Sequence, residues 1–293
     1  MARAEVIARV RHSALLLNVM GFLRDGEILA AAPRRVFLDI DPGFGQMWKE
    51  LDMADVFAGH DDFVTIGENI GRLGCPVPTC GLNWVSTPQP VVLDHWPATS
   101  PPSEGPLTSV ASWRGAYGPV EYLGTVYGLR VHEFRKFAGL PRRCHFRCRL
   151  ALDIHPSETK DLALLAEHGW ELADPRRVAG DPCAYQAFIR ESAAEFMVAK
   201  GMYVQTGCGW LSDRSLCYLA TGRPVLAQDT GLSGLYPTGR GLITFTTPDE
   251  AVAAAEELRR DYLRHAQAAR ALVEEYFDSD RVLGRLLDRL GVE

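Results

Sequence analysis

A glycine-containing stretch in the second half of the chain carries the residue types best suited to binding an anion. It reads Gly207-Cys208-Gly209-Trp210-Leu211-Ser212-Asp213-Arg214-Ser215, and its last four residues begin a predicted helix from about Ser212 to Thr221. The first N–H groups of a helix lack intrahelical acceptors and lie at the positive end of its dipole, which suits a phosphate. Ser212 or Asp213 can cap this helix. The stretch therefore predicts either a phosphate-binding helix start or a purely structural cap.

Arg214 bears on the choice between these two interpretations. It falls in the first turn of the predicted helix, where the dipole disfavours a cation unless an anion lies nearby. A bound phosphate would explain its presence through charge-assisted hydrogen bonds. The alternative is a structural cap with Arg214 in solvent. The chain has no GxGxxG fingerprint, so an ordinary NAD site is not predicted.

A second candidate loop, Ser112-Trp113-Arg114-Gly115, follows a predicted strand at Thr108–Ser112. The Arg114 guanidinium offers two parallel donors for a phosphate, and Gly115 permits a close approach of backbone to ligand. The alternative is a turn with Trp113 in the core.

A third candidate is the pair Asp39 and Asp41, which ends a predicted strand at Val36–Ile40. Ligands of open α/β sheets bind at the carboxyl ends of the strands. We expect Asp41, the nearer of the two to the mouth of the sheet, to be a general base that deprotonates an acceptor hydroxyl. The alternative is a turn or helix-capping aspartate before Pro42.

The seven cysteines show no disulfide framework, which favours free thiols in a reducing compartment. Cys144, His145 and Cys148 suggest a metal site, but no second ligand pair follows at the usual spacing. We interpret the two cysteines as residues on alternate faces of a strand and predict no metal site and no cofactor.

The bulk composition points away from nucleic acid and membrane. The formal net charge is −6, whereas nucleic-acid-binding proteins usually carry a basic face. The apolar run from Ser13 to Leu23 is shorter than the ~20 residues that span a bilayer. Glu5, Asn18 and Gly21 also make it a poor signal peptide. A cytoplasmic protein without a transmembrane segment is expected.

Strands and helices alternate along the chain, which predicts parallel sheets covered by helices. The strands predicted in the first half are Ala14–Met20, Val36–Ile40, Val56–Ala58 and Phe63–Ile66. Those of the second half include Thr108–Ser112, Phe146–Leu152, Trp170–Leu172, Glu195–Ala199, Val225–Gln228 and Leu242–Phe245. Helices are expected between them and over the last thirty or so residues.

Four segments follow from this pattern. Residues 1–97 form an incomplete Rossmann-like lobe, 98–106 a Pro/Ser/Gly-rich linker, 107–270 a second lobe and 271–293 a closing helix. The first half is short for a doubly wound domain of ~six strands, so its lobe is abbreviated.

The second half resembles the donor-binding lobe of glycosyltransferases with the GT-B fold. Cys208-Gly209-Trp210-Leu211-Ser212 is similar to the start of the signature segment of UDP-dependent members, and Gly222-Arg223-Pro224 to its later turn. Asp229-Thr230-Gly231 is similar to a loop that faces the sugar phosphate in retaining members. Gly207 stands where UDP-dependent members have a histidine, and Cys217 where retaining members have a ribose-binding glutamate.

The resemblance implies two Rossmann-like lobes with parallel sheets and a metal-independent hexosyltransferase that uses a nucleoside-diphosphate sugar and an acceptor. It implies a closing helix that returns to the first lobe after Phe277-Asp278-Ser279. The donor would be bound by Arg114, Gly115, Gly209, Trp210, Ser212, Asp213, Arg214, Ser215, Asp229, Thr230 and Gly231. A nucleotide-sugar epimerase and a non-catalytic binding protein on the same scaffold are the alternatives.

Overall fold

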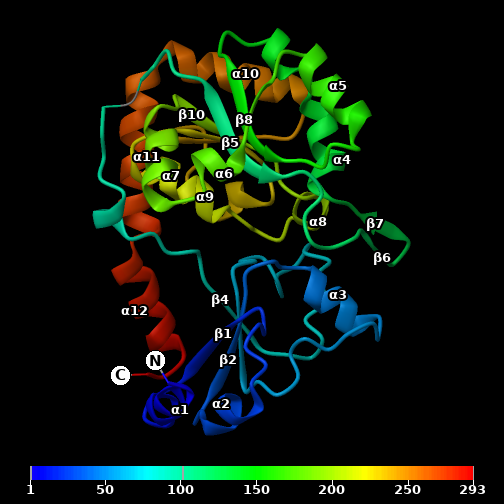
Figure 1. The fold of residues 1–293 in the computed structure, drawn as a ribbon, viewed down its shortest axis with the longest axis vertical. Coiled ribbons are helices and arrows are strands. Elements are labelled where there is room, and N and C mark those ends of the chain that lie inside the picture. Colours follow the sequence, from blue (N-terminus) through cyan, green and yellow to red (C-terminus); the bar gives the residue numbers. More distant parts are fainter. Residues whose placement is uncertain (1, 101, 293) are drawn as a thin grey trace.

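The computed structural model describes residues 2–100 and 102–292. It contains two parallel sheets. The first sheet has the order β1-β2-β3-β4 and the second the order β12-β11-β10-β5-β8-β9. The first sheet consists of β1 (Leu16–Val19), β2 (Arg35–Asp39), β3 (Asp62–Thr65) and β4 (Trp84–Ser86). The second consists of β5 (Leu107–Ser112), β8 (Cys148–Asp153), β9 (Glu171–Ala173), β10 (Ala194–Met197), β11 (Val225–Gln228) and β12 (Leu242–Phe245). Each sheet forms one of two lobes (Figure 1), and the N-terminal lobe is the smaller.

Helices and one hairpin complete the two lobes. Those of the N-terminal lobe are α1 (Arg3–Arg11), α2 (Gly26–Ala31) and α3 (Phe44–Glu50). The C-terminal lobe has α4 (Arg130–Phe134), α5 (Thr159–Glu167), α6 (Pro175–Val178), α7 (Pro182–Arg190), α8 (Gly201–Thr206), α9 (Asp213–Ala220), α10 (Pro248–Arg260) and α11 (Tyr262–Tyr276). A hairpin of β6 (Val120–Tyr122) and β7 (Thr125–Tyr127) precedes α4, and α12 (Ser279–Arg289) ends the order.

Alternating side chains divide the core of the C-terminal lobe into two clusters. Along β11, Val225 and Ala227 belong to one cluster and Leu226 to the other, because successive residues of a strand point to opposite faces. The first cluster continues into the N-terminal lobe through Phe44 and Met47. The apolar interior is therefore continuous between the lobes, which fixes the loops that meet at their junction.

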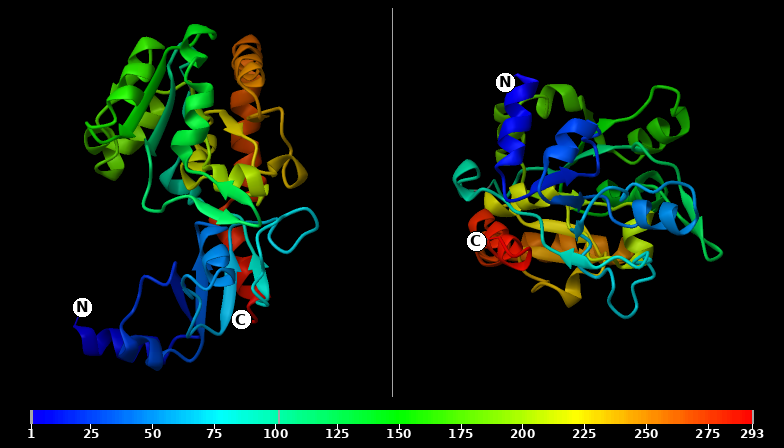
Figure 2. Two further views of the ribbon diagram at one scale, coloured as in Figure 1. Left: turned by 90° about the vertical axis from the view of Figure 1, so that its right-hand side faces the viewer. Right: turned by 90° about the horizontal axis from the view of Figure 1, so that it is seen from below.

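The last helix crosses from one lobe to the other. Phe277 and Asp278 separate α11 from α12, and Leu286 of α12 and the following Leu290 pack against Val36 and Val64 of the N-terminal sheet. Figures 1 and 2 show α12 running beside that sheet. The predicted linker is held to the C-terminal lobe, since Arg223 donates to the Thr99 carbonyl oxygen over 3.3 Å. One linker residue, Pro101, lies outside the described part of the chain.

The expected strand at Val56–Ala58 is wrong. These residues form a loop between α3 and β3, and Phe57 is buried against the ring of Phe37, 5.0 Å away, in place of pairing with a neighbouring strand. The fourth strand of that sheet is instead β4, whose three half-buried residues give too short a pattern to be recognised. Among residues 2–100 and 102–292, no helix is both long and apolar enough to cross a bilayer.

Candidate functional site

A cavity of about 250 Å³ lies at the junction of the two lobes. In the C-terminal sheet the strand order reverses between β5 and β10, and open α/β sheets bind ligands at the carboxyl ends of the strands beside such a reversal. We call this space the switch-point cavity. Its lining consists of Met20, Phe22, Ile40, Asp41, Gln89, Tyr117, Arg130, Lys200, Tyr203, Trp210, Asp213 and Arg214.

Arg130 bridges the two strands at the reversal. It is the first residue of α4, its side chain is buried, and its guanidinium donates to the carbonyl oxygens of Val198 (3.1 Å) and Ser112 (3.5 Å). These carbonyls lie at the ends of β10 and β5. Burial, together with the nearby charge of Arg214, lowers the Arg130 pKa to about 10. Within the described residues, no carboxylate forms an ion pair with Arg130.

Arg214 supplies the second cation and enters the cavity from the start of α9. Its Nε is buried and has no hydrogen-bond partner among the residues that the structure describes. Arg214 forms an ion pair with Asp213, whose Oδ1 lies 3.8 Å from Nη1 of Arg214, and the Asp213 side chain is largely exposed. A buried N–H group without a hydrogen-bond partner destabilises the protein, so this arrangement favours a bound ligand that accepts a hydrogen bond from Arg214.

The helix start beside Arg214 differs from the expected cap. Of the two predicted caps, Ser212 and Asp213, it is Ser212 that occupies the capping position of α9, but its buried side chain forms no capping hydrogen bond. Its hydroxyl oxygen lies 3.4 Å from Oδ1 of Asp213. Ser215 also points away from the cavity, since its hydroxyl donates to the buried Glu195 over 2.5 Å. The first-turn N–H groups of α9 are thus left without a side-chain cap.

Lys200 and Asp41 connect the lobes across the cavity. Lys200 Nζ lies 2.6 Å and 2.8 Å from the two carboxylate oxygens of Asp41, and the Tyr203 hydroxyl donates to the same carboxylate. The rings of Phe44, Tyr117 and Tyr203 surround Nζ at 5.0, 5.6 and 5.3 Å. Burial lowers the Lys200 pKa, while Asp41 opposes the shift. Asp41 is therefore at the predicted place, but its charge is already paired.

The glycine stretch before α9 is braced internally. Gly209 donates its N–H to the Thr230 carbonyl oxygen (2.7 Å), so the expectation that this N–H is free for a phosphate is wrong. The Thr230 hydroxyl donates to the Trp210 carbonyl oxygen over 2.5 Å. Asp229 accepts the N–H groups of Gly231 and of the next residue.

These hydrogen bonds position Trp210, but the other residues that form them do not themselves line the switch-point cavity. Asp229, Thr230 and Gly231 do not line the switch-point cavity, whereas Trp210 does and stacks on Tyr203 with ring centroids 4.3 Å apart. A Cβ on Gly231 would lie 2.5 Å from the Gly207 carbonyl oxygen, so only glycine fits there. These residues act on the site through the shape of the loop.

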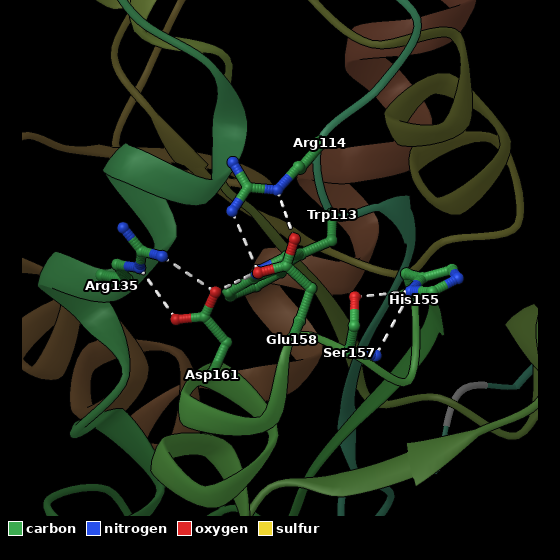
Figure 3. Close-up of polar contacts among 7 residues, drawn as sticks. All are labelled: Trp113, Arg114, Arg135, His155, Ser157, Glu158 and Asp161. Carbon is green, nitrogen blue, oxygen red and sulfur yellow. Dashed lines mark hydrogen bonds and ion pairs between the residues drawn. The ribbon is translucent and has the colours of Figure 1, made fainter.

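Arg114 and Gly115 lie in a different cavity of about 670 Å³, beside the ends of β5 and β8. Figure 3 shows the Arg114 guanidinium paired with both carboxylate oxygens of Glu158. Next to it, Asp161 accepts from Arg135 over 2.9 Å and from the Trp113 indole over 2.7 Å. We call this space the Arg114 cavity. The structure does not bring Arg114 together with Arg214.

The sequence interpretation missed Arg130, Lys200 and Tyr203, which line the switch-point cavity. Asp41 is predicted because ligands of open α/β sheets bind at the carboxyl ends of strands. The same rule applies to Lys200, which directly follows the predicted strand Glu195–Ala199. Arg130 lies between the predicted strands Thr108–Ser112 and Phe146–Leu152, where a helix is expected. Its approach to the site depends on a close contact between Gly128 and Gly201, which no local pattern reveals.

Cys144 and Cys148 do not lie on alternate faces of one strand, which corrects the interpretation from sequence. Cys144 precedes β8, which starts at Cys148, and the two Sγ atoms are 3.9 Å apart. His145 is paired with Glu256 over 2.7 Å. In the described part of the chain, no cluster of three or more histidine, cysteine or acidic side chains could hold a metal ion.

Comparison with known proteins identifies the fold. No family model matches the chain, and no curated protein matches it in sequence. Sucrose-phosphate synthase from Thermosynechococcus elongatus superposes with a TM-score of 0.60 at 11% identity, covering 99% of this chain and 80% of that one. HepE from Anabaena, solved with UDP and glucose, gives 0.59 at 12% identity, covering 98% and 80%.

A third solved structure shows the same likeness. It is an alpha-glucosyltransferase in complex with UDP and DNA, with a TM-score of 0.57 at 10% identity, and the match covers 97% of this chain and 82% of that one. The chain has the GT-B fold of these enzymes, with a shortened lobe.

Proposed function

We propose that the protein is a glycosyltransferase that moves a sugar from a nucleoside-diphosphate sugar to an acceptor hydroxyl or amine. The observation that carries this proposal is the pair Arg130 and Arg214, two guanidiniums without a hydrogen-bonded carboxylate at the reversal of the C-terminal sheet. Such groups recognise a diphosphate with charge-assisted hydrogen bonds. That HepE was solved with UDP-glucose adds support from the same fold.

The donor's diphosphate would lie between the two arginines and the open first turn of α9. There the cations stabilise the negative charge that develops on the departing nucleotide, and the proposed reaction needs no metal. Trp210 and Asp213 line the same space and would contact the donor. Ser212, Ser215 and the segment Asp229–Gly231 would act by holding the loop in shape.

Asp41 is the proposed general base. As the acceptor oxygen bonds to the sugar, the bond from the sugar to the diphosphate breaks, and the acceptor proton passes to the Asp41 carboxylate. In the ligand-free arrangement Lys200 neutralises this carboxylate. A donor phosphate that attracts Lys200 would weaken this pairing and leave Asp41 able to accept the proton, so we expect donor binding before acceptor binding.

A non-catalytic sugar-nucleotide-binding protein is the second candidate. It is favoured by Cys217, which stands where the resemblance expects a ribose-binding glutamate. The two functions share the arginine pair and differ in whether the sugar leaves the nucleotide.

The test is a panel of UDP-, GDP-, dTDP- and ADP-sugars, with binding followed by thermal shift and sugar release by nucleotide production, with and without EDTA. A donor at 100 times its dissociation constant adds about 2.7 kcal/mol to the unfolding free energy. We expect one nucleotide class to stabilise the wild type and not Arg214→Ala, with Arg176→Ala as control because Arg176 is exposed in the other cavity. No stabilisation by any member would overturn the proposal, and binding without release would favour the second candidate.

A further inference from the structure

The cysteine pair at the amino end of β8 is unrelated to the switch-point cavity. Cys148 starts β8, whereas Asp153 ends this strand at the Arg114 cavity, so the pair lies at the opposite edge of the sheet from both arginine-lined spaces. Cys144 and Cys148 line a separate cavity of about 410 Å³. We infer that Cys144 and Cys148 form a redox-active dithiol that a peroxide converts into an intramolecular disulfide.

The first support is distance. The two Sγ atoms are 3.9 Å apart, and a disulfide requires about 2.05 Å. The segment from Arg143 to Phe146 consists of a turn and bends before β8, so side-chain rotation and a small backbone adjustment can close the gap. All seven cysteines are free in this structure, and no other pair among the described residues has its sulfur atoms in contact.

The second support is the different access of the two thiols. Cys144 is partly exposed, whereas Cys148 is only 1% exposed. The contact with Cys148 holds the pKa of Cys144 below its usual range, and the same contact, with burial, raises the pKa of Cys148. Burial raises the pKa of Cys75, Cys80, Cys208 and Cys217. An accessible thiolate beside a protected thiol is the arrangement of an attacking and a resolving cysteine.

The chemistry balances with hydrogen peroxide as the oxidant. The Cys144 thiolate attacks one peroxide oxygen, the O–O bond breaks, and the leaving hydroxide takes a proton to become water. The resulting sulfenic acid is attacked by the Cys148 sulfur, its S–O bond breaks, and a second water leaves with the Cys148 proton. The two thiols lose two electrons, and the peroxide gains them.

The cross-link would form where the C-terminal sheet begins. The backbone carbonyl oxygen of Arg147, which lies between the two cysteines, accepts a hydrogen bond from the N–H of Leu107 over 2.8 Å. Leu107 is the first residue of β5. The disulfide would therefore stiffen the start of β5 and β8 without reaching the carboxyl ends of the strands. We expect oxidised and reduced protein to bind the same nucleotide with equal affinity.

The experiment treats the full reduced chain with hydrogen peroxide, alkylates the remaining thiols and digests with trypsin. Trypsin cleaves after Arg143, Arg147 and Arg149, so a disulfide would join the peptides 144–147 and 148–149, and dithiothreitol would separate them. We expect this cross-linked pair at peroxide concentrations that leave Cys183, an exposed thiol, reduced. Recovery of both peptides alkylated, at a peroxide dose that oxidises Cys183, would overturn the inference.

Two variants separate the roles. In Cys148→Ser, dimedone should trap the sulfenic acid of Cys144, and in the wild-type chain iodoacetamide should label Cys144 about tenfold faster than Cys75. In Cys144→Ser, Cys148 should stay reduced. Cys183→Ser is the matched control and should form the disulfide at the wild-type rate. Equal reactivity of Cys144 and Cys75 in the wild-type chain would also contradict the inference, and that measurement needs no variant.

Discussion

The switch-point cavity and the Arg114 cavity lie at the carboxyl ends of the same sheet, and each contains an arginine from a loop or helix start. In the Arg114 cavity the Arg114 guanidinium donates to both carboxylate oxygens of Glu158, Arg135 donates to Asp161 beside it (Figure 3), and Arg176 is exposed to solvent. In the switch-point cavity the Arg130 and Arg214 guanidiniums donate to no carboxylate within the parts of the chain that the structure describes, and the Asp213 carboxylate lies 3.8 Å from Arg214. A position at the sheet edge therefore does not by itself favour an anion. A buried guanidinium without a hydrogen-bonded carboxylate does.

The largest effect is expected at the buried guanidinium whose Nε has no hydrogen-bond partner among the described residues. Replacing Arg214 by alanine should weaken binding of the nucleoside diphosphate by about 30- to 150-fold, because a charged hydrogen bond contributes about 2–3 kcal/mol. Isothermal titration measures this, and circular dichroism of the ligand-free variant checks the fold. An unchanged dissociation constant would put the diphosphate elsewhere.

Asp41 separates catalysis from binding in the same cavity. Asp41→Asn should lower kcat by roughly 10²- to 10⁴-fold, because the acceptor loses its base. The affinity for the sugar donor should stay the same or increase, because the Asp41 carboxylate no longer competes with the donor phosphate for Lys200. Initial rates and titrations with one donor measure both quantities. A variant with normal kcat would remove Asp41 from the mechanism.

The Arg114 cavity provides the contrasting substitutions. Arg114→Ala should change donor affinity by less than about threefold, because that guanidinium is already engaged by Glu158. Glu158→Gln should uncover Arg114 and add a weak second site for inorganic phosphate, detectable by NMR titration. If Arg114→Ala abolished donor binding, the contrast between the cavities would be reversed.

The two regions should also differ in how pH changes stability. Burial raises the pKa of Asp39, behind Asp41, from 3.8 to about 6. The native state therefore keeps a proton that the unfolded chain releases, and the free energy of unfolding falls by about 3 kcal/mol as pH rises from about 4 to 6. Asp161 behaves oppositely, since Arg135 lowers its pKa and its stabilisation is lost as pH falls below about 4.

Urea unfolding across this pH range measures both slopes. Asp39→Asn should flatten the fall between about pH 4 and 6, and Asp161→Asn should flatten the loss below about pH 4. The two substitutions are each other's control, because each should leave the other window unchanged. Equal effects of both variants in one window would contradict the assigned shifts.

Sequence patterns predicted the C-terminal sheet well and the site only in part. The buried strands Val225–Gln228 and Leu242–Phe245 have the predicted bounds, because glycine and proline flank short apolar runs. Asp41 and Arg214 could be found because each stands at a recognisable strand end or helix start. Arg130 and the pairing of Arg114 with Glu158 depend on contacts distant in sequence, which local spacing does not encode.

The most direct measurement is a crystal structure of the chain with the nucleoside diphosphate that stabilises it best. We expect phosphate oxygens within hydrogen-bond distance of the Arg130 and Arg214 guanidiniums, with the Arg114–Glu158 pair intact. A diphosphate bound to Arg114, with the switch-point cavity empty, would contradict this expectation.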